Sequence, residues 1–192
     1  MITIGFKSAT IGIFDAQKVN VTKEKFTIKG EQGKGATVEA KISGLSAEAK
    51  KIFGSNNPYF VSQKGTGDLK NEMSILDVPY NVQNAILGWV KDTDKGFTAL
   101  GDQTQPPYAA VFMESEEGTG QPVALALFRG RWSREEISLK TLNEDAFEPE
   151  SEALVMACVA NDEGLSFGMA VGTEEVEKLR AYTFPTEELP KA

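Results

Sequence analysis

The stretch "PPYAAVFMESEEGTGQPVALALFRGRWS", Pro106–Ser133, decides the fold class of the chain. Two runs of apolar and β-forming residues, Tyr108–Glu114 and Pro122–Ser133, flank a polar, glycine-containing turn at Ser115–Gln121. Two such runs around a short polar turn are typical of an antiparallel β-hairpin. The sequence therefore predicts an antiparallel hairpin within a β-rich fold.

The second strand of this hairpin is apolar on both faces where it begins. Alternate residues of a strand point to opposite faces of its sheet. Val123, Leu125 and Leu127 begin one face, and the other face is predicted to hold Ala124, Ala126, Phe128, Gly130 and Trp132. Such a strand is covered on both sides, either within a sandwich or where a sheet meets another subunit.

Arg129 and Arg131 end the first face of the same strand. One interpretation is that their long side chains lie along the surface with the charge in water. The other is that they reach the carboxylates of a neighbouring subunit, because a guanidinium group binds carboxylates in a fork geometry. The second interpretation makes them candidate inter-subunit contacts.

Period-two alternation, β-branched residues and turn signals recur along most of the chain, so strands are the main element. Further strands are predicted at Ala9–Ala16, Lys25–Lys29, Ala36–Ile42, Leu69–Leu76, Ile137–Leu142, Glu152–Val159 and Leu165–Val171. The sequence thus predicts a mainly β fold.

Two short segments have helical periodicity instead. In "LDVPYNVQNAILGW", Leu76–Trp89, Asp77 is placed to cap a helix with Pro79 in its first turn, and Gly88 allows the chain to turn back. The apolar stripe of this helix consists of Val82, Ala85, Ile86 and Trp89. A possible C-terminal helix, Thr173–Tyr182, begins with a Thr cap and an acidic first turn.

The segment 43–67, "SGLSAEAKKIFGSNNPYFVSQKGTG", is predicted as a long loop between two strands. Loops beyond about 12 to 15 residues are usually functional or disordered. This one carries Phe53, Tyr59 and Phe60, which favours a loop that packs on a partner. The alternative is that these aromatic residues fold back on the chain's own core.

No Pro-, Ser- or Gly-rich linker divides the 192 residues, so a single domain, 1–192, is expected, with a possible C-terminal extension at 173–192. The N-terminus lacks the basic and apolar regions of a signal peptide, and no apolar window is long enough for a membrane span. These features predict a soluble protein made in the cytoplasm.

The composition argues against catalysis and metal binding. Histidine is absent, which removes the commonest general base and metal ligand. The single cysteine, Cys158, lies in an apolar run and is interpreted as a buried thiol. "GEQGKGAT", Gly30–Thr37, lacks the spacing of a phosphate-binding loop, and the acidic pairs do not converge. No catalytic, cofactor-binding or metal-binding residue is predicted, and the protein is not expected to be an enzyme.

Charge is distributed unevenly. Residues 1–134 carry 16 Lys and Arg against 14 Asp and Glu, whereas residues 135–192 carry 4 against 14. The acidic C-terminal third argues against binding of nucleic acid there, since phosphate binding needs clustered cations. This third is either a solvated acidic surface or one of two complementary faces through which identical copies meet.

The order of several motifs resembles that of the major tail protein family of long-tailed bacteriophages, particularly those that infect Gram-positive hosts. These motifs are a D-x-P step into a short helix in "LDVPYNVQNAILGW", a "PYAAVF" strand, a long strand ending in "FRGRW", a "KT" strand and a final "CVAND" strand. The likeness covers roughly residues 36–164. Asn56 and Asn57 stand where the family's loop tip usually carries acidic residues.

The resemblance implies a tail-tube fold, a two-sheet β-sandwich with one short flanking helix. It further implies hexameric rings that stack into the tube through which DNA leaves the capsid. DNA would pass without specific binding, and the tape-measure, tail terminator and distal tail proteins would be partners in the virion tail. The candidate ring-stacking residues are Phe53, Asn56, Asn57, Tyr59 and Phe60.

A second hypothesis from the residues is a soluble β-sandwich module that binds carbohydrate or peptide, with Trp89, Tyr108 and Trp132 as stacking groups. Aromatic residues scattered in this way are more often part of a core. Assembly into rings or tubes distinguishes the first hypothesis from this one.

Overall fold

The computed structural model describes residues 3–18, 21–141 and 149–186. Two helices are formed, α1 (Tyr80–Leu87) and α2 (Thr173–Thr183). The strands are β1 (Thr3–Phe14), β2 (Thr22–Ile28), β3 (Ala36–Ser43), β4 (Lys50–Gly54), β5 (Asn57–Ser62), β6 (Lys70–Leu76), β7 (Val90–Asp92), β8 (Phe97–Ala99), β9 (Ala109–Glu117), β10 (Pro122–Ser133), β11 (Glu152–Cys158) and β12 (Phe167–Val171). The mainly β prediction is confirmed.

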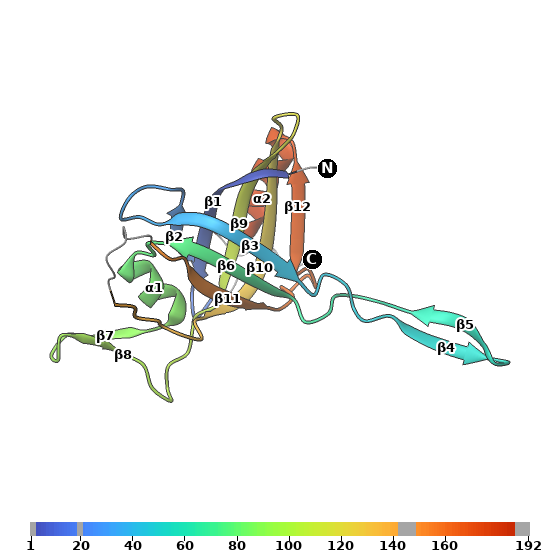
Figure 1. Cartoon of the computed structure of the whole chain (residues 1–192), viewed down its shortest axis with the longest axis horizontal. Coiled ribbons are helices and arrows are strands. Elements are labelled where there is room, and N and C mark those ends of the chain that lie inside the picture. Colours follow the sequence, from blue (N-terminus) through green and yellow to red (C-terminus); the bar gives the residue numbers. More distant parts are fainter. Residues whose placement is uncertain (1–2, 19–20, 142–148, 187–192) are drawn as a thin grey trace.

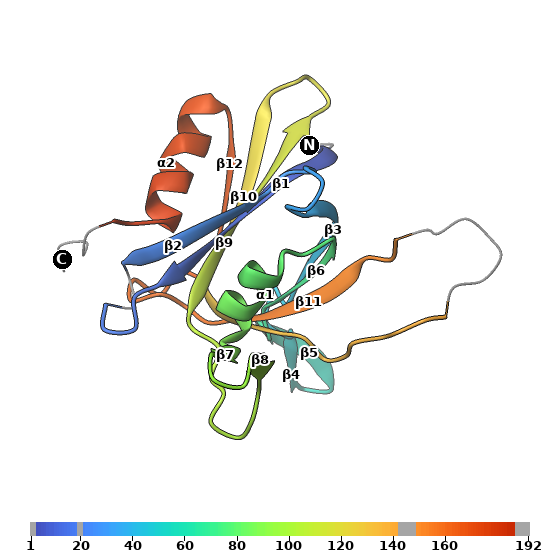
Figure 2. The same cartoon turned by 90° about the vertical axis from the view of Figure 1, so that its left-hand side faces the viewer.

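One antiparallel sheet in the order β2-β1-β9-β10-β11-β6-β3 forms the body of the protein, and β12 pairs with β10 outside this path. The long strand β10 belongs to both layers of the fold. Its first half, Val123–Leu127, pairs with β12, and its second half, Gly130–Ser133, pairs with β11. The sheet therefore folds over at β10, and its two halves lie face to face as the layers of a sandwich (Figure 2).

The fold at β10 depends on a glycine. The pairing of β10 with β9 shifts register between Leu127 and Gly130. A Cβ atom at Gly130 would lie 2.5 Å from the carbonyl oxygen of Ala157, so a larger residue would push β11 away. Gly130 thus allows β11 to approach at the point where the second layer begins.

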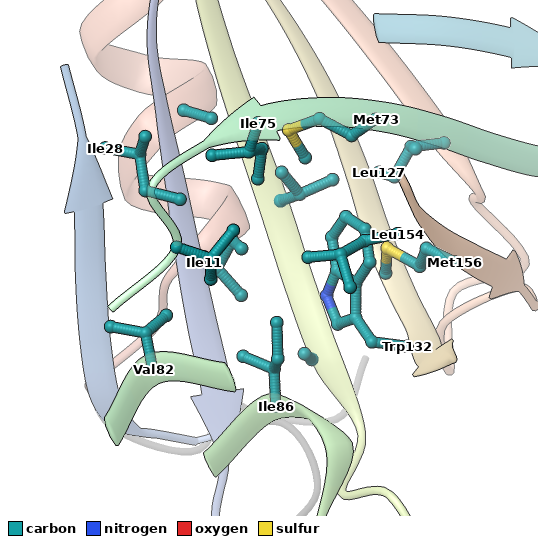
Figure 3. Close-up of a cluster of buried hydrophobic side chains, with 14 of the residues drawn as sticks. Ile11, Ile28, Met73, Ile75, Val82, Ile86, Leu127, Trp132, Leu154 and Met156 are labelled. Atoms are coloured by element: carbon teal, nitrogen blue, oxygen red, sulfur yellow. The ribbon is translucent and has the colours of Figure 1, made fainter. Parts of the chain in front are cut away.

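The main core fills the space between the two layers. Ile11 and Leu127 come from one layer, Met73 and Leu154 come from the other, and Trp132 lies between them with no exposed surface (Figure 3). Helix α1 closes one end of this space with Val82 and Ile86, which point at the strands (Figure 3). A helix of this length is not stable alone, and the core contact holds it.

A second apolar cluster lies under α2, on the side of β1, β9 and β10 that points away from the main core. Its strand residues are Phe14, Ala110, Phe112, Ala124, Ala126 and Phe128, and α2 and the residue after it contribute Val176 and Phe184. The strand Pro122–Ser133 is therefore covered on both faces, as its sequence predicts.

Both predicted helices are present, but neither cap prediction is correct. Pro79 occupies the N-cap position of α1 and Gly172 that of α2, and neither helix has a side-chain cap bond. The Asp77 carboxylate instead accepts a hydrogen bond from the Gly33 amide at 2.7 Å. Gly88 has φ of 67° and ends α1 in the left-handed conformation, which confirms its predicted role.

The predicted strand Ile137–Leu142 is wrong over residues 137–141, which form no strand, and Leu142 lies outside the described residues. Ile137 is 60% and Leu139 93% exposed, because no neighbouring strand pairs with this segment. Four short strands were not predicted: β4 and β5 lie within the expected loop 43–67, and β7 and β8 follow α1.

Candidate functional site

The segment between β3 and β6 forms the hairpin β4–β5, which projects from the body of the protein (Figure 1). Its strands pair from Lys50 with Ser62 to Gly54 with Asn57. The two turn residues, Ser55 and Asn56, have φ of 50° and 63°, the left-handed conformation that the tightest hairpin turns require. An extended ribbon therefore replaces the predicted loop.

The predicted stacking residues Phe53, Asn56, Asn57, Tyr59 and Phe60 all lie at the outer end of this hairpin. Phe53 is 64% exposed, Tyr59 83% and Phe60 56%. The alternative that these aromatic residues fold back on the chain's own core is therefore wrong.

The base of the hairpin is held in place by hydrogen bonds along segment 43–67. The Ala47 amide donates to the Gly65 carbonyl at 3.1 Å, and the Gly67 amide donates to Gly44 at 2.9 Å. Gly44 has φ of 78°, and a Cβ there would lie 2.1 Å from the carbonyl oxygen of Asp68. The ribbon thus leaves the body in a defined direction.

Exposed apolar side chains occupy both faces of the ribbon. Ile52 pairs with Phe60 on one face, and Lys51 pairs with Val61 on the other. Ile52 and Val61 are each about half exposed, at 48% and 51%. An isolated two-stranded ribbon is marginally stable in water, and contiguous exposed apolar surface marks an interaction site. The hairpin has the character of a segment that is completed by another molecule.

Arg129 and Arg131, the candidate inter-subunit contacts, both contact groups of their own chain. Arg129 is 9% exposed, and its Nη1 lies 2.9 Å from Oδ1 of Asp162. The Arg131 guanidinium lies over the Tyr108 ring, 4.3 Å from its centroid. These intrachain contacts anchor β10 to the loops beside it, and a role of either arginine between subunits stays a prediction.

The aromatic residues of the ligand-binding hypothesis lie in structural positions. Trp132 is fully buried in the main core, and Trp89 packs against the same core. Tyr108 carries the Arg131 guanidinium on its ring and borders the cluster under α2. The three rings therefore do not form an open stacking platform.

Cys158 is partly buried against the main core, and burial raises the pKa of its thiol to about 12. A thiol that stays protonated at neutral pH is a poor nucleophile. Within residues 3–18, 21–141 and 149–186, no group of three or more His, Cys, Asp and Glu side chains could hold a metal ion. Neither helix in this part of the chain is long and apolar enough to cross a membrane.

A second exposed ribbon, β7–β8, was not predicted. Its first strand ends at Asp92, whose carboxylate accepts hydrogen bonds from the turn amides of Asp94 and Lys95 at 3.1 and 3.0 Å. The Lys95 amide and ammonium group, with the Asp94 amide, hold the pKa of the Asp92 carboxyl below its usual range. The sequence signal that was available is "DTDKG" between Val90 and Phe97, since Asp and Gly at these spacings favour a tight turn.

The outward face of the β3–β6–β11 layer carries short and mixed-charge side chains. In β11, Leu154 and Met156 face the core, whereas Ala153 and Ala157 are exposed. Lys41 of β3 and Glu72 of β6, which are paired across the sheet, are also exposed. The opposite face of the sandwich is covered by α2 (Figure 2), so this face is the exposed broad side of the sheet.

Comparison with known proteins gives one family. A search of curated proteins finds no match. A family model described as phage tail tube protein matches residues 1–171, which include every strand of the sandwich and the hairpin β4–β5. This family is one of structural components of the virion tail. The chain belongs to the phage tail tube protein family.

Proposed function

We propose that this chain is the major tail-tube subunit of a long-tailed bacteriophage, and that its role is structural rather than enzymatic. Copies close into hexameric rings, the rings stack, and the lumen is the conduit through which DNA is ejected. The observation that carries the proposal is the hairpin β4–β5, which projects from the body of the protein (Figure 1) and in which Phe53, Tyr59 and Phe60 are exposed to solvent. Family membership supports the same role.

The stacking contact is assigned to the outer end of the hairpin, including Asn56 and Asn57 in and beside its turn. Burying three exposed aromatic side chains against another copy would supply much of the driving force, at about 25 cal/mol per Å² of apolar surface. The neutral Asn56 and Asn57 add hydrogen-bonding groups without charge, so apolar contact rather than ion pairing dominates at this end.

The outward face of the β3–β6–β11 layer is assigned to the lumen. The other broad face is already covered by α2, and the exposed side chains on β11 are the small residues Ala153 and Ala157. Small side chains leave room for a duplex, and Lys41 is paired across the sheet with Glu72, so its charge is compensated. Lys70 and Arg131, the cross-strand neighbours of Ala157, are also engaged within the chain, Lys70 with Asp68 and Arg131 with the Tyr108 ring. Cations that are paired in this way bind phosphates less strongly than a free cluster does.

The remaining partners follow from the resemblance to the Gram-positive siphophage type. The tape-measure protein would lie inside the tube during assembly, and the tail terminator and distal tail proteins would bind its two ends. Assembly would take place in the host bacterial cytoplasm before the tail joins the virion.

The test compares the wild-type chain with the variant Phe53→Ser, Tyr59→Ser, Phe60→Ser. The wild-type protein, concentrated or mixed with its tape-measure protein, is expected to form rings and tubes by negative-stain microscopy. The variant is expected to keep the wild-type circular dichroism spectrum and thermal midpoint but to form no tubes, because the three side chains are exposed in the monomer.

A matched control, Tyr59→Phe, keeps the apolar surface and should assemble normally. Wild-type protein that stays monomeric with the tape-measure protein present would contradict the proposed function. A triple variant that is unfolded would show instead that the hairpin belongs to the core.

A further inference from the structure

Two exposed apolar surfaces lie at opposite ends of the longest axis of the protein. The hairpin β4–β5 is at one end, and α1 with the ribbon β7–β8 is at the other (Figure 1). We call Phe53, Tyr59 and Phe60 the tip surface, and Val90, Phe97 and Ala99 the base surface. If copies stack by translation along this axis, the tip surface of one copy meets the base surface of the next.

The base surface is one face of the ribbon β7–β8. Val90 pairs with Ala99, and Asp92 pairs with Phe97, so these four side chains share a face. Thr98 points to the other face, toward α1, where its hydroxyl is hydrogen-bonded to the hydroxyl of Tyr80. The Asn84 amide also donates to the Thr98 hydroxyl at 3.3 Å.

The ribbon is thus held to the body through one face while its apolar face remains exposed. Val90 is 72% and Phe97 54% exposed, and the neighbouring Leu100 is 68% exposed. Adjacent apolar residues on one face of a short ribbon differ from the scattered single residues of ordinary surfaces. This exposed apolar face is a candidate docking surface for another short ribbon.

The charges of the two segments are of opposite sign. Segment 43–67 carries Lys50, Lys51 and Lys64 against Glu48, whereas segment 90–102 carries Asp92, Asp94 and Asp102 against Lys91 and Lys95. The first segment is therefore net positive and the second net negative. Lys51 lies nearest the tip surface, and Lys50 and Lys64 lie toward the base of the hairpin, so the opposite net charges favour the approach of the two segments.

We propose that the tip surface of one copy packs on the base surface of a copy in the next ring. The contact is heterologous, because two different surfaces of the same chain meet, and repeating it along one axis generates an open filament. The proposal rests on the function proposed above and adds the surface that receives the hairpin.

The test uses two variants, Tyr59→Asp in the tip surface and Phe97→Asp in the base surface. Both side chains are exposed, so both variants should keep the wild-type circular dichroism spectrum. Each variant alone is expected to form no tubes, because each lacks one half of the contact. The matched variants Tyr59→Phe and Phe97→Leu keep apolar side chains and should form tubes.

Mixing the two Asp variants distinguishes a direct contact from two unrelated defects. Tyr59→Asp retains an intact base surface, and Phe97→Asp retains an intact tip surface, so the tip of Phe97→Asp can pack on the base of Tyr59→Asp. The two surfaces left at the ends of this pair both carry an Asp, and no further copy can be added. Sedimentation soon after mixing should show particles of twice the mass of either variant alone and nothing longer.

Normal tubes from Phe97→Asp, or the absence of pairing in the mixture, would overturn the proposal. A wild-type chain that forms no tubes is a separate result, which contradicts the proposed function itself. Loss of tubes in Tyr59→Asp alone, with Phe97→Asp unaffected, would place the receiving surface elsewhere on the subunit.

Discussion

At the scale of single residues, Asp77 connects two parts of the chain that are distant in sequence. It has φ of 53°, a left-handed conformation that few residues other than Gly, Asn and Asp adopt readily. From this conformation its carboxylate accepts the hydrogen bond of the Gly33 amide, in the turn between β2 and β3. Asp77, three residues before α1, thereby fixes a turn rather than the helix.

Replacing Asp77 is therefore expected to lower the free energy of unfolding by an amount that depends on the new side chain. Asp77→Ala removes the hydrogen bond and disfavours the positive φ, so the free energy of unfolding should fall by about 1–3 kcal/mol. Asp77→Asn keeps both an acceptor oxygen and a tolerance for positive φ, and should remain close to the wild type. Urea unfolding of the three proteins checks the order. Equal losses for Ala and Asn would show that the carboxylate charge matters instead.

At the scale of elements, α2 covers the outer face of the sandwich over β9, β10 and β12. Phe184, directly after the helix, is 5% exposed and lies over Gly12, where a Cβ atom would be 2.5 Å from its ring. Arg180 of α2 is paired with Glu114 at 2.6 Å and lies over the Phe112 ring. The family match ends at residue 171, so α2 lies beyond the matched residues although it covers their apolar face.

Phe184→Ala is expected to destabilise the monomer by about 3 kcal/mol, because the change leaves a cavity between α2 and β1. Tyr59→Ala removes an equally large side chain from the hairpin, where it is 83% exposed, and should change the monomer's unfolding free energy by less than about 0.5 kcal/mol. Chemical unfolding of the two variants measures both values. A small loss for Phe184→Ala would show that the end of α2 contributes little to the fold.

Elements whose own residues show the periodicity of a strand or helix could be predicted from the sequence. Strands that depend on a pairing partner elsewhere in the chain could not. β10 has the predicted bounds, because both of its faces are apolar and each is covered by a core. The predicted face of Trp132 is wrong, since the register shift between Leu127 and Gly130 places this side chain in the main core with Leu127 rather than with Phe128. Ile137 and Leu139 alternate as in a strand, but forming a strand also requires a partner, which the sequence of that segment does not reveal. β4 and β5 were missed because both of their faces are apolar and exposed, so no alternation marks them.

The candidate site was also predicted only in part, because some of its contacts join residues that are distant in the sequence. Phe53, Tyr59 and Phe60 are conspicuous because aromatic residues are unusual in a long loop. Neither interpretation of Arg129, a surface cation or an inter-subunit contact, includes its intrachain partner Asp162, which lies 33 positions away and becomes a neighbour only in the folded chain. The base surface was missed because Val90 and Phe97 look like ordinary core residues until the structure places them outside.

At the scale of the whole molecule, the two broad faces of the sandwich differ in what they offer to an assembly. One face is covered by α2 (Figure 2), and the other carries the exposed residues Ala153 and Ala157. If the second face lines the lumen, a duplex can slide along it because its cations Lys41, Lys70 and Arg131 face Glu72, Asp68 and the Tyr108 ring. Cations added to that face, repeated around every ring, should then turn the channel into a binding site.

Ala157→Lys tests this assignment, with Ala181→Lys on the exposed side of α2 as the matched control. Both variants are expected to form tubes, and wild-type tubes should pellet without short duplex DNA. Ala157→Lys tubes should pellet with DNA that resists nuclease at low salt and is released as salt rises, because displaced counterions make phosphate binding steeply salt-dependent. Any DNA held by Ala181→Lys tubes should be digested, since that lysine lies outside. Nuclease-sensitive DNA on Ala157→Lys tubes would place the β3–β6–β11 layer on the outer surface of the tube.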